Sequence, residues 1–436
     1  MIKISRNGAA MIAILSILGG CTEKAAFHPS QQSGGNPTLP KAQNFLIPPM
    51  QVPEGVGWKQ GQTPQVAAGL QIERIADGLQ HPRQLLVLPN GDVLVVESNG
   101  PGSEPTTTPK QLIAGIVKGR SGKAAKGGNR ITLLRKITAT GPWERHIFLS
   151  NLHSPFGLQL IGGFLYVANT DGIVKYPYVT GQTEITAPGV VWADLPSTVN
   201  HHWTKALLAN SDGSKLYVGV GSNSNITENS LAVEYRRATV LEVDVATGGS
   251  RIYASGLRNP TGLQWDKPGG TLWAIVNERD EIGADLVPDY MTSVRESGFY
   301  GWPYSYYGQH VDERVKPPMP ELVAKALVPD YALGPHTASL GLVSSVGTAL
   351  PARFASGMFI GQHGSWNRRP HSGYKVIFVP FDGSRAAGES VDVLTGFLSE
   401  DGNAFGRPVG VALDKQGALL VADDVGNTVW RVSTRP

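Results

Sequence analysis

Four short stretches of the sequence carry more polar side chains than turns between strands require. They are the histidine pair His201-His202, Gly221–Asn225 (GSNSN), Val276–Tyr290, which holds five carboxylates, and Gly361–Arg369 (GQHGSWNRR). An imidazole accepts a proton near neutral pH, and calcium binds carboxylate and carbonyl oxygens. These residue types therefore suit acid–base catalysis, a calcium site and the binding of a polar ligand.

Each stretch also has a purely structural interpretation. A histidine is more often packed or exposed than catalytic, and carboxylates in a loop are commonly solvated. Trp203 and Trp366 suit stacking on a flat ligand and packing between sheets equally well. The acidic stretch is not an EF-hand, because Gly283 cannot take the sixth loop position while the other ligand spacings hold. It also lacks the His and Cys spacing of a zinc site.

Other catalytic signatures do not compete with these stretches. The sequence contains no G-x-S-x-G elbow, no P-loop and no H-E-x-x-H motif. No G-x-G-x-x-G follows a strand into a helix, which argues against a dinucleotide-binding unit.

A recurring hairpin must position these residues. In each copy a Pro or polar turn precedes an apolar run, a Gly, Asp or Asn turn, and a second apolar run. The six copies are His81–Ser98, Ser154–Thr170, His202–Ser222, Arg258–Glu278, Thr337–Ser365 and Gly406–Asp424. Their spacing of about 50 to 80 residues suits four-stranded blades with insertions. We therefore expect an all-β fold, a six-bladed β-propeller spanning residues 62–436.

Further apolar segments complete the expected blades. They are residues 129–137, 172–178, 238–245, 374–381 and 428–433. The last, TVWRVS, lies at the C-terminus, where pairing with an N-terminal strand would close the ring. With 53 glycines and 31 prolines scattered over 436 residues, the composition also favours many turns rather than helices.

The N-terminus has the layout of a bacterial lipoprotein signal. Lys3 and Arg6 precede an apolar run too short to span a bilayer, and LGGC ends at Cys21, the one cysteine of the chain. We expect a signal peptide over residues 1–20, a lipid anchor at Cys21 and a location on the periplasmic side of a bacterial membrane. Residues 21–61, rich in Pro, Gly, Gln and Ser, suit a flexible tether. The net charge of +3 argues against a nucleic-acid partner.

Several longer stretches, in order, resemble one family. HHWTKALLANSDGSKLYVGVGSNSN, ASGLRNPTGLQW, VNERDEIGADLVPDY, GFYGWPYSYYGQH, HTASLGL and GQHGSWNRR are similar to the L-sorbosone dehydrogenase group of sugar dehydrogenases that use pyrroloquinoline quinone (PQQ). This group is related to soluble quinoprotein glucose dehydrogenase, and the resemblance runs from about residue 70 to the C-terminus. It implies a six-bladed propeller that binds PQQ and Ca²⁺ in its central cleft.

The resemblance also implies roles for individual residues. His202 matches the general base that takes the substrate's hydroxyl proton while hydride passes to the quinone. Asn225 and Arg407 match cofactor contacts, and Arg368 is the candidate for the family's cofactor lysine. Arg279 and Asp280 match the residues whose backbone carbonyls hold calcium.

The sequence departs from the glucose enzyme at several of these positions. His201 stands where that enzyme has an aspartate partner of the base, and Ser224 and Val409 replace arginines. Phe156 replaces a glutamine of the substrate site. These changes imply a less polar sugar site, so glucose is a poor candidate substrate.

We therefore expect an exported quinoprotein dehydrogenase that oxidises an aldose or a ketoaldose such as sorbosone. Its electrons would pass to a periplasmic cytochrome or a membrane quinone. Two alternatives stay open: a calcium-dependent lactonase or esterase that activates water at the acidic stretch, and a binding propeller without catalysis.

Overall fold

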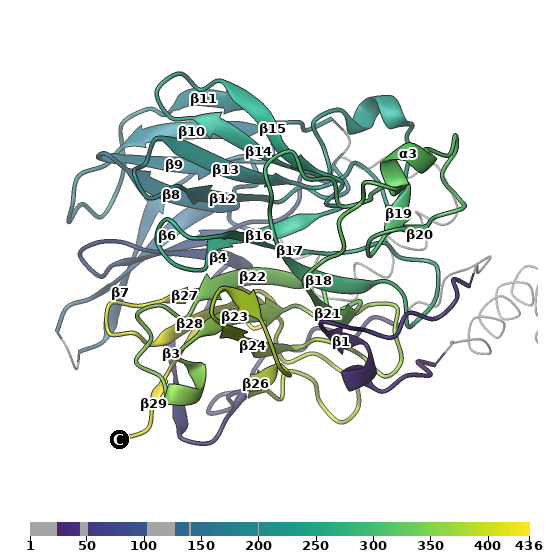
Figure 1. Ribbon diagram of the computed structural model, residues 1–436. Helices are drawn as coiled ribbons and strands as arrows, with labels where there is room; N and C mark the ends of the chain where they lie inside the picture. The colour runs from purple at the N-terminus through teal and green to yellow at the C-terminus, as the bar shows by residue number, and fades with distance from the viewer. Residues whose placement is uncertain (1–23, 44–50, 103–126, 139–140, 199) are drawn as a thin grey trace, which may run out of the picture.

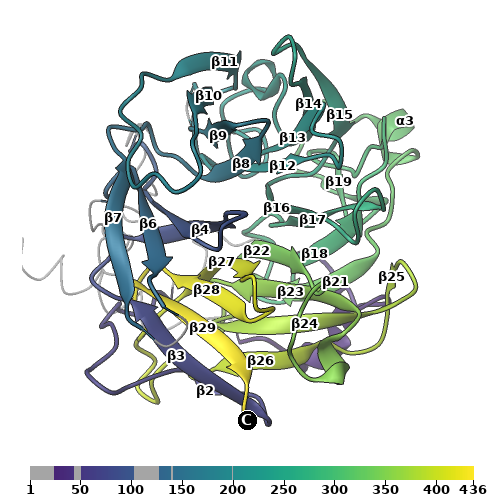
Figure 2. The ribbon, with the colours of Figure 1, turned by 90° about the vertical axis from the view of Figure 1, so that its left-hand side faces the viewer.

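Six antiparallel sheets stand around a central axis in the part of the chain that the structure describes (Figures 1 and 2). The computed structural model describes residues 24–43, 51–102, 127–138, 141–198 and 200–436. The expected signal peptide and Cys21 lie outside these ranges. None of the helices in the described ranges is long and apolar enough to cross a membrane.

Each sheet is a blade whose strands run from the axis outward in chain order, except that the N-terminal strand β3 is outermost in the last blade. The first three blades are β4 (Pro82–Val87), β5 (Val93–Glu97), β6 (Arg130–Lys136), β7 (Trp143–Leu149); β8 (Gly157–Ile161), β9 (Phe164–Ala168), β10 (Gly172–Pro177), β11 (Val190–Asp194); and β12 (Lys205–Ala209), β13 (Lys215–Val220), β14 (Thr239–Asp244), β15 (Ser250–Ser255).

The other three blades complete the ring. They are β16 (Pro260–Trp265), β17 (Leu272–Val276), β18 (Pro288–Ser293), β21 (Tyr331–Pro335); β22 (Ser339–Ser344), β23 (Gly357–Gln362), β24 (Lys375–Asp382), β26 (Val391–Thr395); and β27 (Pro408–Leu413), β28 (Leu419–Asp423), β29 (Thr428–Thr434), β3 (Leu70–Ala76). The inner strands β4, β8, β12, β16, β22 and β27 contact one another in this order, and β27 returns to β4. The expected six-bladed propeller is confirmed.

The last blade closes the ring with strands from both ends of the chain. C-terminal β29 pairs with β3 in antiparallel register, from Val429 opposite Ala76 to Thr434 opposite Leu70 (Figure 2). The prediction that the C-terminal segment pairs with an N-terminal strand is therefore confirmed. Such pairing makes the ring depend on contacts between the two ends of the sequence.

The second strands of the blades are mostly apolar. Every residue of β5 (VLVVE), β17 (LWAIV) and β28 (LLVAD) is buried, because each blade packs against a neighbour on both faces. Apolar side chains from adjacent blades form the core clusters between them, such as Ile75, Leu85, Val95 and Leu420 between the last blade and the first. Continuous apolar runs rather than strict alternation are the sequence signature of strands covered on both faces.

The hairpins gather polar side chains at one end of the propeller. In an antiparallel hairpin the first residue of the inner strand lies opposite the last residue of its partner, as Lys205 lies opposite Val220 and Pro408 opposite Asp423. Residues just before each inner strand and just after its partner therefore share one face, which we call the site face. All four polar stretches noted in the sequence include residues at these positions.

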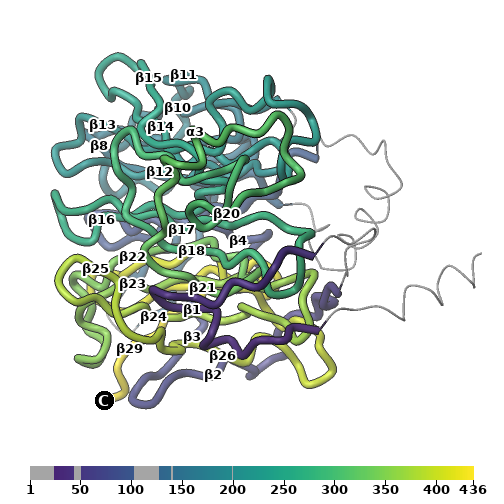
Figure 3. Tube along the Cα trace, turned by 45° about the vertical axis from the view of Figure 1, so that its right-hand side comes forward, coloured from purple at the N-terminus to yellow at the C-terminus, as the bar shows by residue number. Residues whose placement is uncertain are grey.

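The N-terminal segment lies against the propeller wherever it is described. β1 (Ser33–Gly34) adds to the outer edge of β21, and β2 (Gln65–Val66) adds to β26 (Figure 3). Gln32 is fully buried, and its side chain donates to the carbonyl of Asp285 at 2.8 Å. Residues 24–43, which the composition predicted to be part of a tether, thus contribute an edge strand and buried contacts.

Within the described residues, several short strands, one short helix and three 3-10 turns lie in the connections outside the four-stranded blades and in the N-terminal segment. They are β19 (Ser305–Tyr306), β20 (His310–Val311), β25 (Arg385–Ala386), α3 (Pro320–Val323) and the 3-10 turns Pro29–Gln31, Leu231–Glu234 and Ala352–Phe354. β19, β20 and α3 belong to the connection between β18 and β21 (Figure 1). This connection packs over the acidic stretch, as described below.

Candidate active site on the site face

His202 lies just before β12, half-buried, with its two ring nitrogens in different environments. Nδ1 lies 3.0 Å from the carbonyl oxygen of Ser222 and 3.0 Å from the Ser222 hydroxyl. That hydroxyl donates its own proton to the carbonyl of Ser224 at 2.7 Å, so both Ser222 oxygens accept. Nδ1 therefore carries the proton and Nε2 presents a lone pair.

The surroundings keep His202 neutral. Burial lowers the pKa of His202 well below its usual value of 6.5, and the positive charges of Arg258, His201 and Arg237 act in the same direction. A neutral imidazole with a fixed tautomer and an unshared Nε2 is ready to accept a proton. His201 is exposed and its ring meets that of His202 edge-on, with centroids 4.6 Å apart. It therefore does not supply the carboxylate that the glucose enzyme has at this position.

Buried polar contacts fix the loop that carries His202. Arg237 donates to the side chain of Asn200 at 3.0 Å, and Asn200 donates to the Thr170 hydroxyl at 2.8 Å. Thr170 and Lys205 each donate to the carbonyl of Trp203, both at 3.2 Å. Burial lowers the pKa of Lys205 to about 7, so the side chain binds its ammonium proton only weakly. The loop is thus tied to two blades.

Gly221 allows the base to sit close to the neighbouring blade. A Cβ at this position would lie 2.5 Å from the Cβ of His202 and 2.4 Å from Oδ1 of Asn259. Asn259 is buried, and its Oδ1 accepts no hydrogen bond within the described residues. The absent side chain thus brings an unused acceptor next to the candidate base.

Asn225 joins two charged groups of the site face. Its Oδ1 accepts from Arg258 Nη2 and from the backbone N–H of Asp280, both at 2.9 Å. Its Nδ2 donates to the carbonyl of Asp280 at 3.2 Å, and one amide proton remains for a ligand. The side chain of Arg258 also donates to the carbonyl of Glu278 at 2.6 Å. Asn225 therefore holds Arg258 beside His202 and sets the position of the acidic stretch.

The two residues expected to hold calcium lie in different environments. The Arg279 side chain is fully buried and bridges Glu278 at 3.1 Å and Asp312 at 2.9 Å, which ties the β19–β20 connection to the end of β17. The carbonyl of Asp280 already accepts from Asn225 at 3.2 Å and from Arg314 at 3.3 Å. Within the described residues, no three His, Cys, Asp or Glu side chains are grouped to hold a metal ion.

The carboxylate of Asp280 belongs to a buried ion pair. Its Oδ1 lies 3.0 Å from His336 Nδ1 and accepts from Asn367 at 2.9 Å, while His336 Nε2 lies 3.0 Å from the carbonyl of Gly283. Burial alone would raise the pKa of Asp280, but His336 and then Arg258 lower it to about 2. Oδ1 of Asn367 is buried and unused. Asp280 is thus ionised and largely occupied by protein donors.

Arg407 and Arg368 are placed apart. Arg407 is fully buried, donates to the Tyr374 hydroxyl through Nη2, and has Nη1 at 3.4 Å from His363 Nδ1. Arg368 instead donates to the carbonyl of Ala284 at 3.0 Å and to Asp285 at 3.0 Å, and reaches Gln32 at 3.4 Å. Every hydrogen bond of the Arg368 guanidinium goes to its own loop, the acidic stretch or the N-terminal segment, so it anchors that segment.

Sequence reasoning missed several buried residues of the site face. Arg258 and His81 precede inner strands, His363 and Asp424 follow partner strands, and Arg83 is the second residue of the inner strand β4. The hairpin register gives the missing signal for Arg258, His81, His363 and Asp424, because these four occupy the two positions that define the site face. Reading those two positions in every copy of the repeat would have found them.

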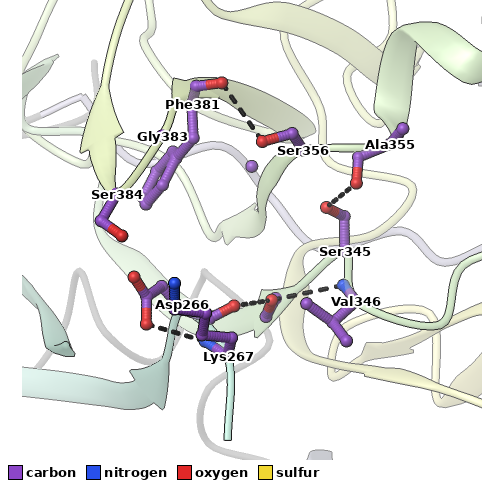
Figure 4. A pocket seen from close by; sticks show the side chains of 11 residues that line it. Asp266, Lys267, Ser345, Val346, Ala355, Ser356, Phe381, Gly383 and Ser384 are labelled. Atoms are coloured by element: carbon purple, nitrogen blue, oxygen red, sulfur yellow. Dashed lines mark hydrogen bonds between the residues drawn. The ribbon is translucent and has the colours of Figure 1, made fainter. Parts of the chain in front are cut away.

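A cavity of about 140 Å³ lies at the opposite end of the propeller, between β16, β22 and β23 (Figure 4). Three of its four serine hydroxyls donate to backbone carbonyls: Ser344 to Asp266 at 2.7 Å, Ser345 to Ala355 at 3.1 Å, and Ser356 to Phe381 at 3.2 Å. On the site face, by contrast, Nε of Arg83 and Arg407 and Oδ1 of Asn259 and Asn367 are buried without partners among the described residues, which makes that face the candidate active site.

Comparisons of the sequence found known proteins that are similar to parts of this chain. An uncharacterized protein of Borreliella burgdorferi is 27% identical over 292 residues, which cover 64% of this chain and 76% of that protein. A pyrroloquinoline quinone-dependent pyranose dehydrogenase of Coprinopsis cinerea is 32% identical over 126 residues, 24% of this chain and 16% of that enzyme. This chain therefore matches only a small part of the enzyme's length.

Solved structures show the same fold. The holo form of the PQQ domain of Coprinopsis cinerea pyranose dehydrogenase has a TM-score of 0.66 at 20% identity, covering 88% of this chain and 100% of that one. The calcium structure of the Trichoderma reesei family AA12 protein has a TM-score of 0.67 at 17% identity, covering 90% and 99%. The PQQ-bound aldose sugar dehydrogenase of Streptomyces coelicolor has a TM-score of 0.55 at 16% identity, covering 85% and 99%.

A sequence model of one family matches most of the propeller. The match covers residues 126–295 and 323–435, which is more than half of the chain. It includes His202, Asn225, Arg258, Asp280 and Arg407 of the site face. The chain belongs to the TrAA12-like family.

Proposed function

We propose that this protein is a PQQ-dependent dehydrogenase that oxidises an aldose or a ketoaldose, with His202 as the general base. The observation that carries the proposal is the fixed tautomer of His202, whose Nδ1–H is held by Ser222 while Nε2 is left to accept a proton. Membership of the TrAA12-like family and the likeness to PQQ-bound sugar dehydrogenases support the redox chemistry.

The polar atoms of the site face fit PQQ, which carries three carboxylates and an electrophilic quinone. Buried N–H groups of Arg83 and Arg407 have no acceptor among the described residues, and Asn259 and Asn367 each keep an unused carbonyl oxygen. Buried polar groups without partners are rare in folded proteins, so this concentration favours a ligand with several polar groups. Arg407 and the free amide proton of Asn225 are the residues that would hold it.

The protein's own side chains would carry out the transfer of the substrate's hydroxyl proton. When bound, PQQ supplies a carbonyl carbon that accepts the substrate's hydride. His202 Nε2 takes the proton of the substrate hydroxyl as the C–H bond breaks, and Ser222 keeps the imidazole in the required tautomer. The charges of Arg258, His201 and Arg237, which lower the pKa of His202, favour the later release of that proton to solvent.

Calcium is a separate part of the proposal. The carbonyl of Asp280 accepts two long hydrogen bonds, from Asn225 and Arg314, and a cation there would replace both. The proton transfer described above does not depend on a metal ion, so the calcium requirement is tested on its own by omitting calcium and adding a chelator.

The site also supports the proposed substrate class. Phe156 is fully buried and meets Trp203 edge-on, with ring centroids 6.1 Å apart, where the glucose enzyme has a glutamine. The wall beside the base is therefore aromatic, which suits a sugar with fewer hydroxyls on that side, or a ketoaldose such as sorbosone whose aldehyde hydrate supplies the reacting hydroxyl.

The decisive assay is dye reduction by apo-protein reconstituted with PQQ, with and without calcium, against a panel of aldoses and ketoaldoses. Dye reduction that depends on both PQQ and sugar supports the proposal. Lactone hydrolysis with calcium alone would identify a hydrolase instead. The absence of both activities would indicate a binding propeller.

We further propose that Cys21 carries a lipid anchor that holds the enzyme on the periplasmic side of a bacterial membrane, with a cytochrome or membrane quinone as electron acceptor. Labelling with a fatty acid in a bacterial host tests the anchor. Label should enter the full-length protein, and Cys21→Ala should abolish it. Equal labelling of both proteins would contradict the proposal.

A further inference from the structure

Two buried arginines of the site face each keep an N–H group without an acceptor. Arg83 is 7% exposed and Arg407 fully buried, and the Nε atom of each has no hydrogen-bond partner among the described residues. Leaving a buried donor unpaired costs about 1–3 kcal/mol, and more for a charged group. Two such donors on one face indicate an acceptor that the protein itself does not provide.

One carboxylate holds both arginines in place. Asp424, just after β28, accepts from Nη1 of Arg83 and lies 2.9 Å from Nε2 of His363. Nδ1 of that histidine lies 3.4 Å from Nη1 of Arg407, whose Nη2 donates to the Tyr374 hydroxyl. The two guanidinium groups thus sit at opposite ends of a short chain through Asp424 and His363. Elements from three adjacent blades, β4, β23–β24 and β27–β28, fix this arrangement.

The Arg407 guanidinium has no carboxylate partner among the described residues. Arg83 donates to the carboxylate of Asp424, and His81 Nε2 approaches it at 3.3 Å, whereas Arg407 is linked to it only through His363. The neighbouring Asp423 contacts neither guanidinium, because its oxygens accept from the backbone N–H of Arg407 and Gly426 and from the indoles of Trp58 and Trp430. Buried charges are normally paired, so the cluster suits an anion.

The unpaired donors lie on the same side as the candidate base. The guanidinium carbon of Arg83 lies 5.7 Å from the ring centre of Trp203, the residue next to His202. Contacts therefore run from His202 through Trp203 and Arg83 to Asp424, His363 and Arg407. A flat ligand that reaches from the base to Arg407 passes Arg83.

We infer that Arg83 and Arg407 together bind one carboxylate group of the ligand, with Asp424 and His363 holding both guanidinium groups in place. On the function proposed above, on which this inference rests, that group belongs to PQQ. Arg83 then takes the cationic position for which the sequence suggested Arg368. The guanidinium of Arg368 is committed to Ala284, Asp285 and Gln32.

The test is a binding titration that needs no turnover. Full-length apo-protein is titrated with PQQ, and the dissociation constant is read from the quenching of tryptophan fluorescence. Arg83→Met and Arg407→Met should each weaken binding about 10- to 100-fold, because each removes a charge-assisted hydrogen bond. Arg368→Met, and Arg385→Met on the exposed strand β25, should leave the constant within about threefold. Unchanged affinity in Arg83→Met would overturn the inference, whatever its effect on stability.

A second probe separates this inference from the proposed function. Pyridine-2,6-dicarboxylate carries carboxylates without the quinone. The melting temperature of the wild type and of each variant is measured with and without this compound, and the rise that it induces is recorded for each protein. A rise in the wild type that is absent in Arg83→Met and Arg407→Met supports the clamp, even if PQQ fails to bind and the dehydrogenase assignment falls. No rise in the wild type together with full PQQ binding by Arg83→Met would refute the clamp and leave the dehydrogenase intact.

Discussion

His202 combines an available Nε2 lone pair with a low proton affinity, and this combination leads to a prediction about the pH dependence of the reaction. Because burial and neighbouring cations lower the pKa of His202 well below 6.5, the base should stay active through and below that pH. The kcat/KM for the sugar should therefore be flat across pH 6.5 and fall only at lower pH. A fall centred at pH 6.5 or above would show that a different group, or a solvated histidine, controls the reaction.

His202 also makes the free energy of unfolding depend on pH in a direction that can be stated. The unfolded chain protonates His202 near pH 6.5, whereas the folded chain does so only at lower pH, so the unfolded state binds more protons between these values. The contribution of His202 to the free energy of unfolding should thus decrease as the pH falls below 6.5. The difference in urea midpoint between wild type and His202→Gln should follow this trend.

Gly221 also decides the geometry of the base, because it has no side chain. A Cβ at this position would meet the side chains of His202 and Asn259 at 2.5 and 2.4 Å, closer than atoms approach, so Gly221→Ala must displace one of them. We expect the kcat to fall about tenfold or more, since small misplacements of catalytic groups cost large factors in rate. PQQ affinity should change little, because neither displaced residue belongs to the arginine clamp.

Gly249→Ala is the matched control, since its Cβ meets nothing closer than the Thr247 hydroxyl at 3.3 Å. Both variants carry the same substitution in a loop next to a strand. Equal kcat values for the two would contradict a positioning role for Gly221.

At the scale of elements, one buried ion-pair network attaches the β19–β20 connection to β17. Arg279 is fully buried between Glu278 and Asp312 and also donates to the carbonyls of Pro303 and Ser305, at 2.9 and 2.6 Å. Arg279→Met leaves two buried carboxylates without this partner and should cost about 3–5 kcal/mol in the free energy of unfolding. Denaturant titration of the full-length protein measures this loss.

The control removes an exposed pair of the same kind. Lys375 and Asp392 lie 2.7 Å apart, with side chains 34% and 50% exposed. Lys375→Met should therefore cost less than about 1 kcal/mol. Losses of similar size in the two variants would show that the buried network does not hold the connection.

For the molecule as a whole, local patterns predicted the blades well. Each expected hairpin became the two inner strands of a blade, because turn chemistry and apolar runs act over neighbouring residues. The closing pair β29–β3 was also predicted, from the lone apolar strand left at the C-terminus. Residues 24–43 behaved differently from their composition, since β1 pairs with the unpaired outer edge of β21, a partner about 300 residues away that no local pattern reveals.

The candidate site likewise has features that local sequence predicts and features that only the fold brings together. The position of His202 follows from the start of its own hairpin, and the structure places it on the site face. The arginine clamp depends on contacts between blades, such as Arg83 with Asp424 and His363 with Arg407, separated by 341 and 44 residues. Arg368 looked suitable by proximity to a family motif, but its local chain path turns its guanidinium toward Asp285. Which blade faces which is set by the ring, so only the fold brings these charges together.

The central claim is that His202 removes the substrate's proton while other residues hold the cofactor. The most direct measurement compares wild type and His202→Ala for PQQ occupancy and for kcat in dye reduction, in the same reconstituted samples. We predict equal occupancy and a kcat lowered by a factor of about 10² or more. Full activity of His202→Ala at equal occupancy would contradict the account.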